Sequence, residues 1–134
     1  MKTPYDAANR WKKQVLDDLR RTLAEEYARE TKLQQAVADI DENLKVEREL
    51  SATSPLYSAD AFAHRCASEK TELQAKLKNI KPIIETLETD MAAAFQNYKA
   101  LDIAKERFIA AALAEAARLE TLALDDVVSR RRAQ

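Results

Sequence analysis

The chain contains no glycine among its 134 residues, and this absence limits its possible folds more than any other feature. Glycine is the residue that most readily adopts positive φ angles, which tight β-hairpins, bulges and phosphate-binding loops require. More than half of the residues are Ala, Leu, Glu, Lys or Arg, a composition typical of coiled coils and long helices. The sequence therefore predicts an all-α fold and disfavours β-sheet architectures and glycine-rich nucleotide sites.

Charge and cysteine content exclude further classes of protein. The formal net charge of −1 disfavours a nucleic-acid-binding protein, since such proteins normally carry a basic surface. The single cysteine, Cys66, excludes an intrachain disulfide and a cysteine-based zinc site. No apolar run approaches the roughly 20 residues that cross a bilayer, and residues 1–11 lack the apolar region of a signal peptide. We expect a soluble cytosolic protein.

A cluster of small residues around Pro55 marks the one expected break in the helical pattern. Pro55 biases Ser54 away from the helical conformation. Ser58 is a suitable N-cap for a second helix, with Asp60 placed in its first turn, where negative charge meets the helix dipole. We predict a helix over about 5–50, a turn over about 51–58 and a helix over about 59–130.

Pro82 lies inside the second helical pattern. A proline within a helix removes its own hydrogen bond and clashes with the carbonyl group four residues earlier, here that of Lys78. The apolar spacing nevertheless keeps its register from Ile80 to Ile84. We therefore favour a kinked but continuous helix at Pro82 over the start of a new element.

Apolar residues recur at three-four spacing in both helices and form one apolar seam on each. In the second helix two series step in multiples of seven, which predicts a left-handed supercoil against another helix. The first seam consists of Leu16, Leu19, Leu23, Leu33, Val37, Ile40 and Leu44. The second consists of Cys66, Leu73, Leu77, Ile80, Ile84, Leu87, Met91, Ala94, Tyr98, Leu101, Phe108, Ala112, Leu119 and Leu122.

Folding the chain back on itself buries both seams, so we predict a long antiparallel two-helix coiled-coil hairpin with a longer C-terminal helix. Pairing positions whose numbers sum to about 107 brings Leu23 to Ile84 and Ile40 to Cys66. The same offset pairs Pro4 near Ile103, which leaves roughly the last 30 residues without a partner. The apolar residues in this overhang are Phe108, Ile109, Leu113, Leu119, Leu122, Leu124, Val127 and Val128.

An isolated helix with apolar residues in water favours association with a partner. The alternatives are that the overhang folds back, frays or pairs in a homodimer. Trp11, which is flanked by Arg10 and Lys12, also has two open interpretations: packing at the base of the hairpin, or an amphipathic anchor for binding.

The sequence offers little for catalysis, and we expect no enzyme, no cofactor and no metal site. The only histidine, His64, and Cys66 are two residues apart, so on a helix they point about 200° apart and do not hydrogen-bond each other. Cys66 occupies a seam position and behaves there as a small apolar residue. Most carboxylates lie at helical spacing from a lysine or arginine, which is typical of a solvated face.

Three features together resemble the flagellar type III export protein FliJ and its injectisome relatives. They are the Arg10-Trp11 start of a long charged helix, the aromatic-led segment Tyr57-Ser-Ala-Asp-Ala-Phe62 after the turn, and the ending Ala123-Leu-Asp-Asp-Val-Val-Ser-Arg-Arg-Arg132. The ending is similar to the family's Leu-Asp-Glu followed by variable residues and Arg-Arg. The resemblance spans the whole chain in length and layout.

The resemblance implies a cytoplasmic, non-enzymatic stalk or adaptor that couples the hexameric export ATPase ring to the export gate, a membrane protein, and assists export chaperones. The stalk is peripheral at the cytoplasmic face of the inner membrane through the apparatus. It implies that Phe62 and Cys66 bind the gate, although both residues alternatively only pack the tip of the hairpin. The residues implied to contact the ATPase ring are Leu124, Asp125, Asp126, Arg130 and Arg131.

We expect no nucleic-acid partner and a monomer when the protein is free. The alternative function is a self-associating coiled-coil scaffold or chaperone unrelated to export, in which the seams pair between chains.

Overall fold

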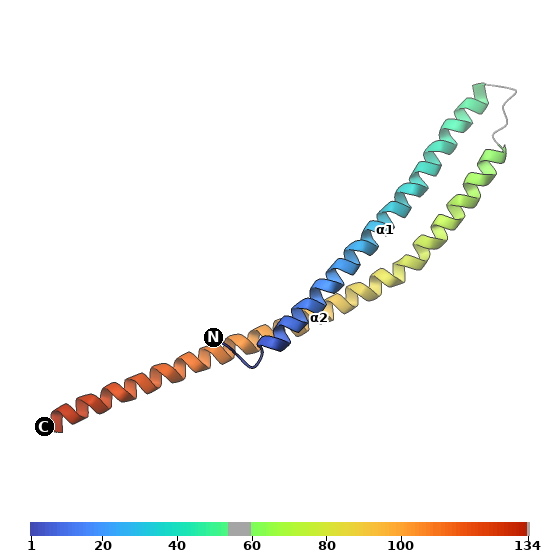
Figure 1. Ribbon diagram of the computed structural model, residues 1–134. Helices are drawn as coiled ribbons and strands as arrows, with labels where there is room; N and C mark the ends of the chain where they lie inside the picture. The colour runs from blue at the N-terminus through green and yellow to red at the C-terminus, as the bar shows by residue number, and fades with distance from the viewer. Residues whose placement is uncertain (54–59, 134) are drawn as a thin grey trace. The chain divides into compact units, whose positions relative to one another are not determined.

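The computed structural model describes residues 1–53 and 60–133, which form two α-helices packed against each other (Figure 1). Helix α1 covers Asp6–Thr53 with 48 residues, and helix α2 covers Asp60–Ala133 with 74 residues. The described residues include no strand, and none of them adopts a positive φ angle. The predicted all-α hairpin with a longer C-terminal helix is confirmed.

Helix α1 continues a few residues beyond its predicted end, since residues 51–53 are still helical. The Thr53 hydroxyl donates a hydrogen bond to the Leu50 carbonyl at 2.9 Å within this last turn. The rest of the predicted turn, including Pro55 and the capping Ser58, lies outside the described residues. Helix α2 begins with Asp60 in its first turn and has three arginines in its last turn, an arrangement that the helix dipole favours.

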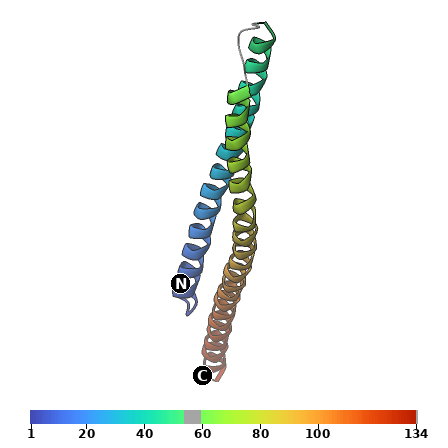
Figure 2. The same ribbon diagram turned by 90° about the vertical axis from the view of Figure 1, so that its right-hand side faces the viewer.

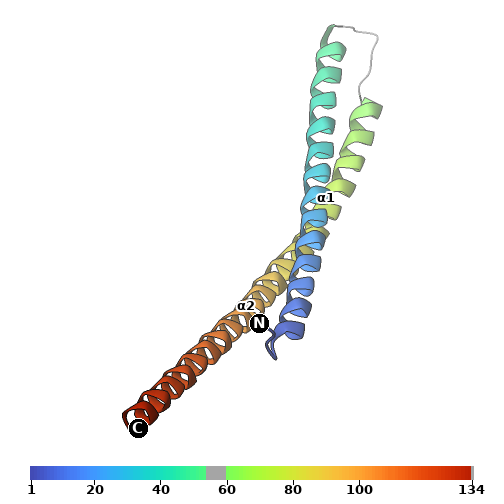
Figure 3. The same cartoon turned by 60° about the vertical axis from the view of Figure 1, so that its left-hand side comes forward.

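Helix α2 is one continuous helix (Figure 3), and Pro82 lies inside it. The proline ring is exposed, whereas Ile80 and Ile84 on either side of it are buried. Burial of these two side chains offsets the loss of one backbone hydrogen bond. The helix is continuous, so the alternative of a new element beginning at Pro82 is wrong, and the kink at Pro82 stays a prediction.

The chain divides into two compact units, and residues 18–91 make up the first. Its core is a cluster of Leu23, Ile80 and Ile84, which are 3–5% exposed, with Leu87 and Met91 packed against it. Leu23 and Ile84, paired by the sequence pattern, therefore lie in one cluster.

Polar contacts within residues 18–91 show a different register from the predicted one. The predicted offset places Asp41 opposite Cys66, but the ammonium group of Lys70 contacts the Asp41 carboxylate at 2.8 Å, one turn further along α2. The Tyr27 hydroxyl donates a hydrogen bond to the Glu88 carboxylate, also further along α2 than predicted. A shift of one turn leaves the same apolar seam facing the partner helix, so the heptad pattern alone determines the register only to within a turn.

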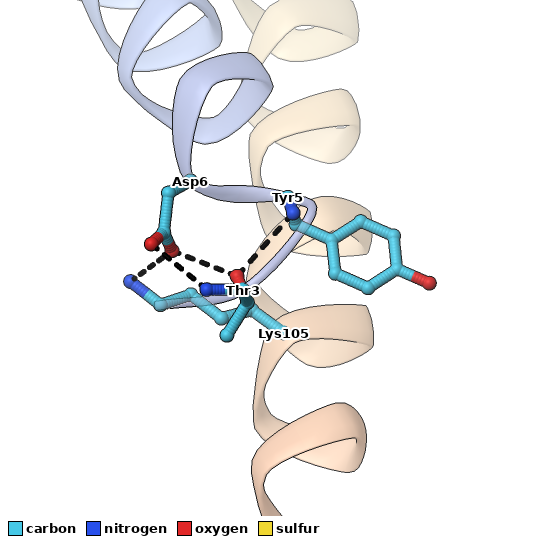
Figure 4. A network of polar contacts seen from close by, with 4 residues as sticks. All are labelled: Thr3, Tyr5, Asp6 and Lys105. Atoms are coloured by element: carbon cyan, nitrogen blue, oxygen red, sulfur yellow. Dashed lines mark hydrogen bonds and ion pairs between the residues drawn. The ribbon is translucent and has the colours of Figure 1, made fainter. Parts of the chain in front are cut away.

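Residues 1–17 and 92–133 form the second unit, in which the start of α1 is held by a capping motif (Figure 4). The Thr3 backbone N–H donates to Asp6 Oδ2 at 3.0 Å, and the Thr3 hydroxyl donates to Asp6 Oδ1 at 2.7 Å. Pro4 follows Thr3 at a position where its missing N–H costs nothing. Lys105 of α2 adds an ion pair to Asp6 at 3.3 Å. This network, which we call the N-terminal clasp, ties the beginning of α1 to α2.

The paired part of this unit extends further along α2 than predicted. The ring of Tyr5 packs edge-to-face on Phe108, with the ring centroids 6.3 Å apart. Ile109 and Ala112 are half-buried, and every described residue after Ala112 is exposed. The prediction that the overhang begins near Ile103 and includes Phe108 is therefore wrong by about ten residues: the register is shifted by about one turn, and the packing of Tyr5 extends the paired part to Phe108. We define residues 113–133 as the tail.

Candidate partner-binding surfaces

The tail is the helical segment at the C-terminal end of α2 (Figure 2). Its apolar side chains are exposed to solvent. Its six large apolar side chains are 46–61% exposed, a level at which their burial by a partner is favourable. These side chains are Leu113, Leu119, Leu122, Leu124, Val127 and Val128.

All five residues predicted to contact an ATPase ring lie in the tail and are exposed. Leu124 is 61% exposed. The Arg130 guanidinium contacts the Asp126 carboxylate at 3.2 Å, one turn away on the same helix. Asp125 and Arg131 have no ion pair within the described residues. The structure thus brings together an exposed leucine and charges of both signs, and their contact with a ring stays a prediction.

A second ion pair in the tail joins Glu115 and Arg118. The Arg118 guanidinium donates two hydrogen bonds to the two oxygens of the Glu115 carboxylate, at 2.7 and 3.0 Å. The hydrogen bonds from Arg118 lower the pKa of Glu115, and the same contact raises the pKa of Arg118. Glu115 breaks the heptad pattern of the second seam, and this local pair provides its partner.

The two residues predicted to bind an export gate have different environments. Cys66 is a free thiol and is only 6% exposed. Phe62 is half-buried, and the Arg65 guanidinium lies 6.0 Å from the centre of its ring. The buried position of Cys66 agrees with the alternative that this residue packs the hairpin. Phe62 is therefore the member of the pair with surface available for a partner.

The sequence left two interpretations of Trp11 open, packing at the base of the hairpin or an amphipathic anchor for binding. Its side chain is 62% exposed, and the Lys12 ammonium group lies 4.8 Å from the centre of its ring. The interpretation of Trp11 as a packed residue at the base of the hairpin is therefore wrong. The side chain is a surface aromatic group with a cation held over it.

A shallow hollow of about 300 Å³ lies between the helices within residues 18–91. Its lining includes Arg29 and Lys76 as well as Ile83, which is 46% exposed. Sequence reasoning missed this hollow, although an isoleucine adjacent to the seam residue Ile84 was a signal of apolar surface. The residues that line the hollow include no carboxylate, histidine or cysteine.

His64 is exposed whereas Cys66 is buried, so the two side chains do not share a site. Among the described residues, no three or more His, Cys, Asp or Glu side chains are grouped so as to hold a metal ion. Neither described helix contains a segment apolar enough to span a bilayer.

No family model, no curated protein and no solved structure matches the chain.

Proposed function

We propose that this chain is a non-enzymatic stalk or adaptor of a flagellar type III protein export apparatus. It couples the export ATPase ring to the export gate and assists export chaperones. The observation that carries the proposal is the exposed tail, in which apolar side chains and charges of both signs extend beyond the part of α2 that contacts the start of α1.

The tail supplies both kinds of interaction that a protein interface needs. Leu124 and its apolar neighbours provide contact area, which contributes most of the binding free energy when it becomes desolvated. Asp125, Asp126 and the arginines that follow provide charges that steer the encounter and set the orientation. In this proposal the tail contacts the ATPase ring.

The packed helices act mechanically in this proposal. Continuous backbone hydrogen bonding along each helix transmits position and torque and needs no catalytic group. Phe62, at the start of α2, contributes the gate contact, while Cys66 supports it by packing. The protein is then peripheral at the cytoplasmic face of the inner membrane through the gate.

Binding to the purified export ATPase hexamer of the same organism tests the ring contact. Deletion of residues 119–134 is expected to abolish association, and Leu124→Glu is expected to weaken it at least about tenfold, because a carboxylate then occupies the apolar contact. Ile103→Glu is the matched control, since Ile103 is an exposed apolar residue of α2 outside the tail, at 46% exposure.

The proposed ring contact is wrong if the chain lacking residues 119–134 binds the hexamer with full affinity. It is also wrong if Ile103→Glu weakens binding as much as Leu124→Glu does. Gene neighbourhood provides an independent check: genes for an export ATPase and its stator beside this gene support the proposal, and their absence weakens it.

A further inference from the structure

One face of the tail carries an ordered row of side chains. The row has six residues, from Leu113 to Arg131, and their positions are separated by four, three, four, four and three residues. At 3.6 residues per turn, these six side chains share one side of the helix. Leu113, Leu124 and Val128 of this row are 59%, 61% and 47% exposed. We call the row the tail stripe, and its members are Leu113, Ala117, Glu120, Leu124, Val128 and Arg131.

The tail stripe has two charges of opposite sign, one on each side of its apolar centre. Glu120 precedes Leu124 by one turn, and Arg131 follows Val128 by one turn, so the charges lie about 16 Å apart along the helix. Neither has a hydrogen bond or an ion pair within residues 1–53 and 60–133. The two ion pairs of the tail, Glu115–Arg118 and Asp126–Arg130, lie off the stripe.

We propose that the tail stripe is a docking surface for the tail of a second copy of this chain, in antiparallel orientation. When the two-fold axis passes between positions 125 and 126, Glu120 of each copy faces Arg131 of the other. The same register places Leu124 opposite Val127 of the second copy. The two charged members of the stripe are thus complementary to each other across the two-fold axis, and Val127, which lies beside the stripe, covers Leu124.

Charge selects this arrangement over the other ways of pairing the stripe. A parallel pair places Glu120 against Glu120 and Arg131 against Arg131, and like charges repel. An antiparallel pair shifted by one heptad places Glu120 against Leu124 and Arg131 against Leu113 of the second copy. That shift lengthens the apolar overlap but leaves charges without partners against apolar surface, which is costly.

The overlap in the proposed register is about 16 residues, or about 24 Å of each helix. An interface of this size lies at the low end of specific interfaces, so the pair is weak, and the protein is a monomer in dilute solution. The stripe includes Leu124 and Arg131, two of the residues assigned above to the ATPase ring. A second copy docked on the tail therefore covers part of the surface proposed for the ring.

Sedimentation velocity of the full chain over about 5 to about 500 µM at low salt tests the pairing. The wild-type chain is expected to dimerise within this range. Glu120→Arg and Arg131→Glu are each expected to raise the dimer dissociation constant at least about tenfold, because each variant places two like-charge pairs in its own dimer. An equimolar mixture of the two variants is expected to form a heterodimer, in which both pairs are again opposite in sign.

Asp125→Arg and Arg132→Glu are the matched controls, because they change the same charges at tail positions off the stripe. Both are expected to dimerise like the wild-type chain, and circular dichroism shows whether each variant is folded. A wild-type chain that stays monomeric throughout the range overturns the proposal. A mixture that stays monomeric while the wild-type chain dimerises also overturns it. The assay contains no ATPase, so its outcome is separate from that of the ring-binding experiment.

Discussion

At the scale of single residues, Asp6 has the most perturbed environment among the described acids. Hydrogen bonds from the Thr3 backbone and then from the Thr3 hydroxyl hold its pKa well below the ordinary 3.8, at about 2. The ion pair with Lys105 acts in the same direction. Each of these contacts favours the charged carboxylate, so the N-terminal clasp depends on Asp6 being ionised.

Acid is therefore expected to open the N-terminal clasp within a defined window. A carboxyl group with a depressed pKa contributes stability above its unfolded value, here 3.8, and that contribution is lost as the pH falls through about 2. NMR titration of the Asp6 carboxyl carbon is expected to give a midpoint near 2, and protection of the Thr3 amide is expected to decrease over the same window. Asp6→Asn removes this acid-dependent step. A midpoint near 3.8 contradicts the clasp.

At the scale of elements, the apolar side chains of α2 have two different environments along its length. Ile80 is 3% exposed in the core of residues 18–91, whereas Leu124 is 61% exposed in the tail. A helix whose apolar residues lie on one seam is stabilised mainly by packing, so the two positions contribute very differently to folding.

We expect Ile80→Ala to lower the free energy of unfolding by about 2–4 kcal/mol, because it leaves a cavity in the core. Leu124→Ala is the matched control and is expected to change the free energy of unfolding by less than about 0.5 kcal/mol. Urea denaturation followed by circular dichroism measures both. Equal effects at the two positions contradict the assignment of core and tail.

Replacement of the internal proline of α2, Pro82, by alanine is expected to stabilise the protein. Pro82→Ala restores a backbone N–H that donates to the Lys78 carbonyl, and the exposed proline ring leaves no cavity. The free energy of unfolding is expected to rise by about 1–3 kcal/mol, measured by the same denaturation. A decrease would mean that the surrounding structure requires the proline.

At the scale of the whole molecule, the buried side chains and the exposed tail lie in separate parts of the chain. No described residue after Ala112 is buried, so deletion of residues 119–134 is expected to change the free energy of unfolding by less than about 0.5 kcal/mol. The measurement is thermal or urea unfolding of the shortened chain. A large loss of stability would show that the tail contributes to the stability of the hairpin. This result would contradict the proposal that the tail is a surface for partners.

Much of this organisation could be predicted from particular residues. The absence of glycine and the heptad series predicted two long helices, and the seam predicted the core position of Ile84 and its neighbour Leu23. The exposed apolar residues of the tail were expected because the two helices are unequal in length. The register was missed by about one turn, because Asp41 pairs with Lys70 and Asp6 with Lys105, and polar contacts of this kind do not follow from a seven-residue period.

The sequence by itself determined the helices and the face of each helix that is buried, because these depend on local backbone preference and on the spacing of apolar side chains. Only the tertiary structure decided the register of the two helices and where the pairing of the start of α1 with α2 ends. Both depend on the axial offset between two helices, and a periodic seam is compatible with several offsets. Contacts such as Tyr5 with Phe108 select among these offsets, and they also determine that the tail begins at residue 113.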